Sequence, residues 1–134
     1  MTEDCIFCKF AKDIINPIKI YEDDLCIAFM DKFPLTKGQS LVVGKEHTDY
    51  LFDVEDKLYS HLFNITKKIV NATDKALPNQ RSWVVVQGMD VPHNHIKILP
   101  IYKGIHINLE EGTGSEATDK ELQEISDKIK EKLQ

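Results

Sequence analysis

One long segment with helical periodicity, placed between short strand-like runs, constrains the fold of this chain more than any other feature. The pattern starts at Asp53, a candidate N-cap, runs to about Leu77, and is ended by the PNQRS stretch. Its apolar residues recur every three or four positions and share one face: Val54, Leu58, Leu62, Ile65, Ile69 and Ala76. We therefore predict one long amphipathic helix that buries a single face against the rest of the chain.

Five strand-like runs accompany this helix. Three precede it, at residues 18–22, 25–31 and 39–45, and a short acidic turn separates the first two. Residues 83–88, WVVVQG, are nearly all apolar and predict a strand buried on both faces, whereas residues 93–99, HNHIKIL, alternate. Strand pairs joined by short turns, with the helices kept apart from them, predict an α+β fold with a mainly antiparallel sheet of about five strands.

Two shorter helices are expected near the ends of the chain. Residues 1–16 carry apolar positions at helical spacing after Asp4, a possible N-cap. Thr118 and Glu121 form a capping-box pattern ahead of a last amphipathic helix. With 134 residues the chain is long enough for one domain with a real core. We assign residues 1–112 to that domain and residues 113–134 to a loop and helix that pack on it.

Composition excludes several classes of protein. Apolar residues make up 42% of the chain, which argues against disorder, and a net charge of −5 argues against binding of nucleic acid. The apolar runs are too short to span a bilayer, and the acidic start lacks a signal-peptide core. An odd number of cysteines, three, argues against a secreted disulfide scaffold and favours the cytoplasm.

The segment VPHNHIKILP carries the densest chemical signal. Side chains alternate along a strand, so His93, His95 and Lys97 share one face, while Ile96 and Ile98 face the opposite way and can serve the core. A single histidine is usually a hydrogen-bonded structural residue. Two imidazoles and an ammonium on one strand face favour a functional site instead.

This segment resembles the signature of the histidine triad superfamily of nucleotide hydrolases and transferases. The stretches CIFCKF and IYEDDLCIAFMDKFPLTKGQSLVVGKEH are similar to the amino-terminal half of the same family, so the resemblance covers nearly the whole chain. It implies a histidine triad fold, a homodimer, and a nucleophilic role for His95 at the α-phosphorus of a nucleotide. Such a role needs one imidazole nitrogen free and the other held protonated by an acceptor, for which a backbone carbonyl is the obvious candidate.

The chain departs from the family pattern at three places. Lys97 stands where the family usually has the third histidine, and Gln39 stands where many members have another histidine facing the phosphate. The loop QGMDVPH lacks a Gly-Gln segment that precedes the first histidine in many relatives. An ammonium binds a phosphoryl oxygen well but gives up its proton reluctantly, so we expect Lys97 and Gln39 to hold phosphate. The alternative for Lys97 is a side chain that extends to solvent beside a weak or inactive site.

The resemblance also indicates how the rest of a nucleotide is bound. Asp31 matches the acidic residue that accepts hydrogen bonds from both ribose hydroxyls, and its two carboxylate oxygens suit two neighbouring donors. Phe7, Phe10, Ile15 and Phe29 match the apolar clamp around the base, although ordinary core is the more common role for each of them taken singly.

Cys5 and Cys8 form a C-x-x-C pair, which by itself could be redox-active, half of a zinc site, or two small buried residues. In a subset of the family such a pair binds zinc together with two histidines that match His47 and His93. The resemblance therefore implies a closed structural zinc site of two thiolates and two imidazoles.

Together these features predict a zinc-containing protein that binds a purine nucleotide, such as AMP or an AMP conjugate, and cleaves or transfers it at the α-phosphate. The first alternative is a non-catalytic nucleotide-binding or regulatory protein with a degenerate triad. The second is a redox or metal-handling protein built on Cys5 and Cys8. Trp83 is expected in the core or at a dimer interface, and His61, His106 and Cys26 are interpreted as structural or surface residues.

Overall fold

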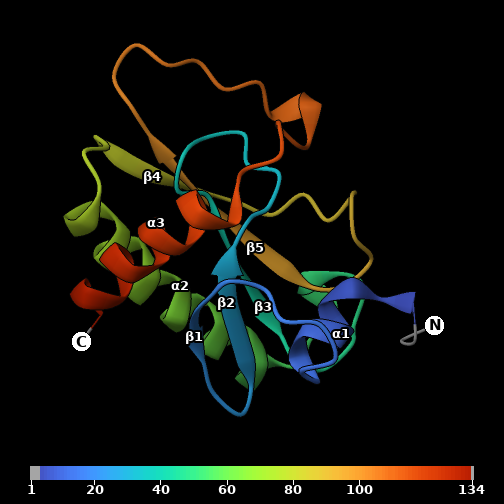
Figure 1. The fold of residues 1–134 in the computed structure, drawn as a ribbon. Helices are drawn as coiled ribbons and strands as arrows, with labels where there is room; N and C mark the ends of the chain where they lie inside the picture. Colours follow the sequence, from blue (N-terminus) through green and yellow to red (C-terminus); the bar gives the residue numbers. More distant parts are fainter. Residues whose placement is uncertain (1–3, 134) are drawn as a thin grey trace.

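A computed structural model describes residues 4–133 and shows one five-stranded sheet with three α-helices (Figure 1). Every neighbouring pair of strands is antiparallel, and the strand order is β1-β2-β3-β5-β4. The strands are β1 (Lys19–Glu22), β2 (Cys26–Met30), β3 (Ser40–Gly44), β4 (Arg81–Val85) and β5 (His95–Ile101). The α+β class and the antiparallel sheet are therefore confirmed.

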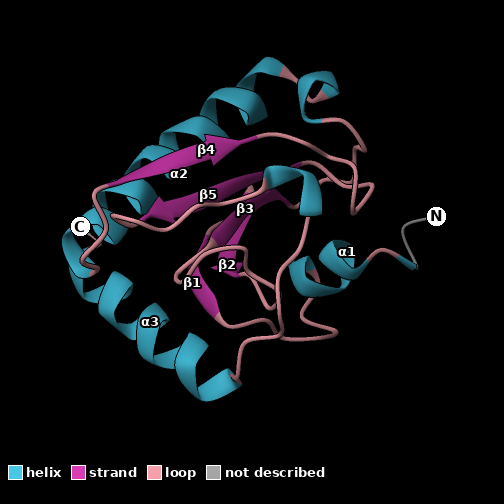
Figure 2. Cartoon of the chain, turned by 90° about the horizontal axis from the view of Figure 1, so that it is seen from above, coloured by secondary structure: helices cyan, strands magenta, loops and turns pink. Residues whose placement is uncertain are grey.

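The helices cover the two faces of the sheet unequally. The long helix α2 (Asp56–Ala76) and the C-terminal helix α3 (Asp119–Lys132) pack against one face, and the short helix α1 (Ile6–Ala11) lies over the other (Figure 2). We call these the α2 face and the α1 face. The main core lies on the α2 face and includes Val42, Ile96 and Ile98, whereas Leu41 and Val43 pack with Phe7 on the α1 face. The alternation of side chains along β3 and β5 thus separates the core from the site described below.

Two predicted helix caps were wrong. The N-cap of α1 is Cys5, whose sulfur accepts a hydrogen bond from the backbone N–H of Cys8, so Asp4 does not cap the helix. The helix α2 begins at Asp56 after the N-cap Glu55, because Asp53 belongs to a separate 3-10 turn, η2 (Leu51–Asp53), which buries Leu51. The predicted cap of α3 is confirmed, since the Thr118 hydroxyl accepts from the N–H of Glu121.

The prediction that the WVVVQG run is buried on both faces was also wrong. In the structure β4 is an edge strand, and Trp83 and Val84 are each 42% exposed. Among residues 4–133, only β5 pairs with β4, so the other edge of β4 has no strand beside it (Figure 1). The strands β2 and β3 are buried throughout, and β5, which lies between β3 and β4, is buried over its first six residues. A continuous apolar run indicates strand structure but does not show which strand occupies the centre of a sheet.

Among residues 4–133, no helix combines the length and the apolar character that crossing a bilayer requires.

Candidate functional site

His95 and Lys97 project from β5 onto the α1 face, as the alternation predicted. Their backbones pair with Val43 and Leu41 of the central strand β3, which fixes both side chains on one side of the sheet. Both residues are almost completely buried, at 2% exposure each. Lys97 therefore does not extend to solvent, so this part of the alternative interpretation was wrong.

The two ring nitrogens of His95 have different surroundings. The Nδ1 atom lies 2.7 Å from the backbone carbonyl oxygen of His93, which can only accept, so Nδ1 carries a proton and donates it. A backbone carbonyl thus holds the tautomer, as expected. The Nε2 atom is buried and has no well-aligned hydrogen-bond partner among residues 4–133. The ring of Phe7 packs edge-on against the imidazole, with centroids 5.3 Å apart.

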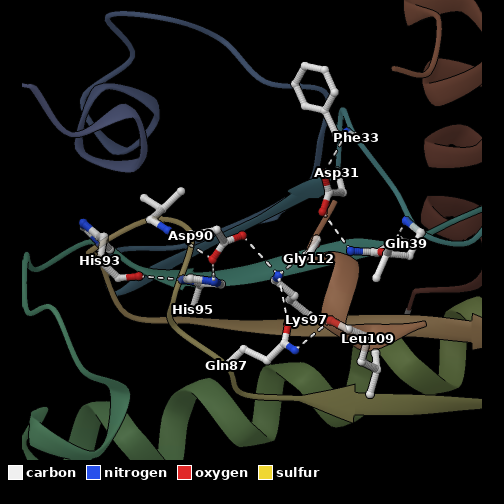
Figure 3. A network of polar contacts seen from close by, with 12 residues as sticks. Asp31, Phe33, Gln39, Gln87, Asp90, His93, His95, Lys97, Leu109 and Gly112 are labelled. Atoms are coloured by element: carbon white, nitrogen blue, oxygen red, sulfur yellow. Dashed lines mark hydrogen bonds and ion pairs between the residues drawn. The ribbon is translucent and has the colours of Figure 1, made fainter. Parts of the chain in front are cut away.

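Asp90 is the functional candidate that the sequence reasoning missed. Its Oδ1 lies 3.2 Å from His95 Nε2, and its Oδ2 lies 3.1 Å from Lys97 Nζ (Figure 3). The imidazole of His95 and the ammonium of Lys97 hold the pKa of this carboxyl well below its ordinary value, against the opposing effect of partial burial. The available signal was its place in the loop that departs from the family pattern, three residues before His93.

The other contacts of Lys97 are longer. Its Nζ lies 3.4 Å from the side-chain oxygen of Gln87 and 3.5 Å from the backbone oxygen of Gly112 (Figure 3). Asp90 therefore supplies the nearest negative charge to this buried ammonium. A buried cation without such a partner would be costly, which explains why a carboxylate lies here.

Asp31 and Gln39 lie opposite each other where β2 ends and β3 begins. The side-chain N–H of Gln39 donates to Asp31 Oδ2 at 2.9 Å, and the Gln39 oxygen accepts from the backbone N–H of Leu35 at 2.8 Å. Asp31 Oδ1 accepts from the N–H of Phe33 at 2.9 Å. Burial raises the pKa of Asp31 above its ordinary value, and these hydrogen bonds only partly offset that effect. Gln39 is fully buried and uses both ends of its amide to position Asp31.

A cavity of about 950 Å³ adjoins these residues. Its size is typical of small-molecule sites, which measure roughly 300–1,000 Å³. The rings of Phe7, Phe10 and Phe29 line it and contact one another edge-on or tilted, with centroids 5.0 to 6.1 Å apart. Asp31 and Asp90 also line the cavity. The structure thus brings the predicted aromatic clamp and the predicted ribose ligand around one space, and Asp90, which lines this space, contacts His95 and Lys97 of β5.

Cys5, Cys8, His47 and His93 converge on a single point on the same face of the sheet. Their donor atoms all lie within 4.8 Å of one another, and the two Nδ1 atoms of the histidines are 3.0 Å apart. The thiol sulfurs lie 3.2 to 3.4 Å from those nitrogens. Four donors at zinc bond lengths of roughly 2.0–2.3 Å in a tetrahedron are separated by roughly 3.3–3.8 Å. The donor set and its spacing therefore fit a zinc ion.

The protonation states of this cluster also suit a cation. Burial lowers the pKa of His93, and its Nε2 lies 2.6 Å from the backbone oxygen of Gly44, so the proton stays on Nε2 and Nδ1 keeps its lone pair for a metal. Burial and the neighbouring Cys5 raise the pKa of the Cys8 thiol to about 11 in the metal-free protein. A bound dication would reverse that shift, because it stabilises the thiolate.

Asn94, which lies between the two histidines and directly precedes β5, fixes the backbone around the metal cluster. Its side-chain oxygen accepts from the N–H of Gly44, and its side-chain N–H groups donate to the backbone oxygens of Glu46 and Thr48. Glu46 and Thr48 flank His47, so one buried amide fixes the loop that carries this ligand. A side chain at position 44 would meet the Asn94 oxygen at 2.5 Å, which explains the glycine.

A second group of possible ligands, Asp23, Cys26 and His61, has another role. Asp23 accepts from the N–H groups of Leu25 and Cys26 and from the hydroxyl of Tyr21, and it lies 2.6 Å from His61 Nε2. Burial raises the pKa of the Cys26 thiol to about 12, which keeps it neutral. These contacts stabilise the turn between β1 and β2, in agreement with the structural interpretation of His61 and Cys26.

Comparison with known proteins gives consistent relatives over most of the chain. The model of the HIT domain matches residues 14–104. An uncharacterized HIT-like protein of Borreliella burgdorferi is 32% identical over 133 residues, which cover 94% of this chain and 96% of that protein. The adenosine 5'-monophosphoramidase hnt1 of Schizosaccharomyces pombe is 33% identical over 98 residues, which cover 72% of this chain and 73% of the relative.

A solved structure agrees with these relatives. A HIT-like protein of Bartonella henselae, described as involved in cell-cycle regulation, superposes with a TM-score of 0.88 at 28% identity and covers 98% of this chain and 97% of its own. The predicted fold is therefore confirmed. The region matched by the domain model holds all the polar site residues except Cys5 and Cys8, which precede it.

Proposed function

The chain belongs to the HIT domain family, and from this membership and the geometry of the site we propose that it binds a purine nucleotide, such as AMP or an AMP conjugate, and cleaves it at the α-phosphate with His95 as nucleophile. One observation carries the proposal. The backbone carbonyl of His93 fixes the His95 proton on Nδ1, and the other nitrogen, Nε2, is buried without a well-aligned partner among the described residues. A neutral imidazole held in this way has its free lone pair on Nε2.

The reaction balances with water as the second substrate. His95 Nε2 attacks the α-phosphorus, so an N–P bond forms, the bond from phosphorus to the leaving group breaks, and the electron pair departs with the leaving group. Water then attacks the same phosphorus, an O–P bond forms, the N–P bond breaks, and the water proton goes to solvent. Splitting one hydrolysis into two displacements is the advantage that a covalent intermediate brings.

Lys97 stabilises charge on the phosphoryl oxygens in this scheme. Its ammonium is buried and fixed on β5, so it can contact the phosphate without a rearrangement of the strand. It is a poor proton donor, and general acid catalysis is typically worth ~10²–10⁴-fold. Substrates with a good anionic leaving group, such as dinucleoside polyphosphates and acyl adenylates, should therefore react better than phosphoramidates. That a relative is named as a monophosphoramidase supports the reaction class.

The nucleoside occupies the cavity of about 950 Å³. Asp31 accepts from the two ribose hydroxyls, and Gln39 holds the carboxylate in place through its 2.9 Å hydrogen bond. Phe7, Phe10 and Phe29 contact the base, and their edge-on arrangement leaves apolar surface toward the cavity. In this assignment Gln39 acts through Asp31, whereas the sequence suggested a direct contact with phosphate.

We assign zinc to Cys5, Cys8, His47 and His93 as a structural metal. When bound, the ion supplies a closed tetrahedral crosslink and no open coordination position for substrate. That crosslink would join the start of α1, the loop after β3, and His93, which lies two residues before His95. The proposed location is the cytoplasm, which the odd number of cysteines, three, favours.

A homodimer is the proposed assembly. The support comes from β4, an edge strand whose unpaired backbone groups and exposed Trp83 and Val84 are open to a second copy. Sedimentation at micromolar concentration should give a dimer, and Trp83→Lys should shift it toward monomer. A wild-type monomer under these conditions would contradict this assembly.

A turnover screen tests the enzymatic proposal. The protein is incubated with an adenosine phosphoramidate, a diadenosine polyphosphate and an aminoacyl adenylate, and AMP release is followed by chromatography. His95→Ala should lower the rate by at least ~10³-fold, since removal of a nucleophile costs most of the rate enhancement. His106→Ala, an exposed histidine after β5, is the matched control and should retain full activity.

The same screen decides between enzyme and non-catalytic binder. Micromolar AMP binding without turnover of any substrate would favour a nucleotide-binding regulatory protein. The observation that favours this second candidate is the ion pair between Asp90 and Lys97, which encloses the site in the free protein.

A further inference from the structure

Asp90 occupies a position that the proposed function requires for phosphate. Its two carboxylate oxygens each contact one nitrogen: Oδ1 lies 3.2 Å from His95 Nε2, and Oδ2 lies 3.1 Å from Lys97 Nζ (Figure 3). The side chains of His95 and Lys97 are 0% and 3% exposed, whereas the Asp90 side chain is 31% exposed and lines the cavity. Asp90 therefore lies between the cavity and the two nitrogens.

We propose that the Asp90 carboxylate occupies the phosphate position of the free protein, and that the phosphate of a nucleotide binds by displacing it. This inference rests on the proposed function and adds a residue that determines selectivity at the same site. Until Asp90 leaves, a nucleoside can enter the cavity but a phosphorus atom cannot reach His95 Nε2.

A carboxylate and a phosphate can occupy the same place beside His95 and Lys97, because both are anions with exposed oxygens. Both groups offer an oxygen to the ammonium of Lys97 and place a second atom in front of the neutral His95 Nε2, so these two nitrogens can face either group. They cannot serve both at once, because the added anion would lie beside Asp90 in a site that already contains Asp31. Lys97 is the only buried lysine among the described residues, so a single ammonium would have to balance all three anions.

The loop that carries Asp90 can move without disturbing the strands. Residues 86–94 have no helix or strand structure, and Gly88 adopts a left-handed backbone with a φ of +67° in open space. Met89 is 91% exposed. Besides its contacts with His95 and Lys97, the Asp90 side chain accepts one hydrogen bond among the described residues, from the N–H of the adjacent Val91. By contrast, Asn94 is anchored to the loop after β3, so movement would be confined to the residues before it.

The displacement has a measurable consequence for selectivity. A ligand that needs an uncovered site binds with its affinity reduced by the fraction of molecules in which the site is uncovered. AMP must place its phosphate where Asp90 lies, so its affinity is reduced in this way. Adenosine has no phosphate and occupies only the cavity, so its affinity is not reduced. Removing the Asp90 charge should therefore improve AMP binding without changing adenosine binding.

The test compares wild type with Asp90→Asn and Asp90→Ala by isothermal titration calorimetry, using AMP and adenosine as ligands. We expect both variants to bind AMP roughly tenfold more tightly, equal to about 1.4 kcal/mol, and adenosine within twofold of wild type. Asp24→Asn, an exposed carboxylate in the turn between β1 and β2, is the matched control and should change neither affinity. AMP affinity that is unchanged or weaker in both Asp90 variants would overturn the proposal.

A second measurement keeps this result separate from failure of the proposed function. Diethyl pyrocarbonate modifies accessible imidazoles, and peptide mass spectrometry locates the modified histidine. Modification of His95 should be slow in wild type and at least severalfold faster in Asp90→Ala, with circular dichroism spectra showing that both proteins are folded at the temperature of the assay. If AMP binds to no variant, the proposed function fails, and this rate alone decides: faster modification supports Asp90 as the cover of His95, and an equal rate refutes it.

Discussion

Two polar clusters lie side by side on the α1 face of the sheet, and they differ in how their negative groups are held. In the metal cluster the donor atoms of Cys5, Cys8, His47 and His93 converge from three segments on one point. In the cluster around Lys97 the imidazole of His95 and the ammonium of Lys97 stand on a central strand, but the carboxylate of Asp90 comes from a loop without regular structure (Figure 3). His93 and His95 are only two residues apart, so the sequence separation does not account for the difference.

The difference lies in what fixes each partner. His93 is held by the carbonyl of Gly44, and the loop that carries His47 is held by Asn94, so both metal ligands have backbone anchors. Among residues 4–133, the Asp90 side chain has no hydrogen bond or ion pair with another segment besides those with His95 and Lys97, the two residues it covers. The metal cluster, whose ligands are anchored, is suited to a structural role. The cluster around Lys97, in which Asp90 can move, is suited to exchange of that carboxylate for a ligand.

The largest expected effect concerns the anchored cluster. Cys8→Ser should reduce zinc from about one ion per chain to below about 0.1, and loss of a structural metal belongs to the few changes that cost more than about 4 kcal/mol of unfolding free energy. Metal analysis measures the zinc content, and thermal denaturation measures the loss of stability. The control is Cys26→Ala, which changes a buried cysteine outside the cluster and should leave the zinc content unchanged. If wild-type protein grown with ample zinc is purified without the metal, the four residues do not form a zinc site and the contrast between the two clusters fails.

A change in the second cluster should raise a rate rather than reduce stability. Lys97→His places a group that can release a proton beside the leaving group, and we expect phosphoramidate cleavage to increase by up to ~10²-fold, the lower end of general acid catalysis. Cleavage of a diadenosine polyphosphate should change much less, because its leaving group needs no proton. Equal effects on the two substrates, measured as kcat/KM, would refute this account of Lys97.

Gln39 tests whether the ribose end of the site resembles the anchored cluster. Gln39→Leu removes the donor to Asp31, and loss of a hydrogen bond to a charged group should weaken adenosine and AMP binding equally, by roughly tenfold or about 1.5 kcal/mol. Gln80→Leu, an exposed glutamine before β4, serves as control. Weaker binding of AMP alone would place Gln39 at the phosphate, as the sequence first suggested.

The smallest effect is the pH dependence of nucleoside binding. Burial raises the pKa of Asp31, and only the ionised carboxylate accepts from both ribose hydroxyls, so adenosine affinity should fall severalfold as pH is lowered toward that raised pKa. Titration calorimetry with adenosine avoids the ionisation of phosphate. Binding of 2',3'-dideoxyadenosine, which lacks both hydroxyls, should not share this dependence.

For stability of the free protein the sign is opposite. Because burial favours the protonated form of Asp31, its contribution is present at low pH and is lost as pH rises through the raised pKa. Nucleoside binding and the stability of the unliganded protein should therefore change in opposite directions over the same pH range. Asp31→Asn should remove both changes.

Local pattern was sufficient to predict much of this molecule. The periodicity around Leu58 and Leu62 predicted α2, and the alternation in β5 placed His95 and Lys97 on one face with Ile96 on the other. These predictions succeed because helix and strand geometry repeat over short distances and depend only on neighbouring residues. The similarity to histidine triad proteins supplied the four metal-binding candidates, which local pattern alone left open.

Contacts between distant segments decided the rest. The apolar run at Trp83 lies at the sheet edge because strand order depends on which strands pair, and Gln39 contacts Asp31 because β2 and β3 bring them together. Asp90 carried no periodic signal, since the path of a loop depends on what it meets in space. The sequence determined which side chains share a face of the sheet, and only the tertiary structure determined that a carboxylate covers two of them.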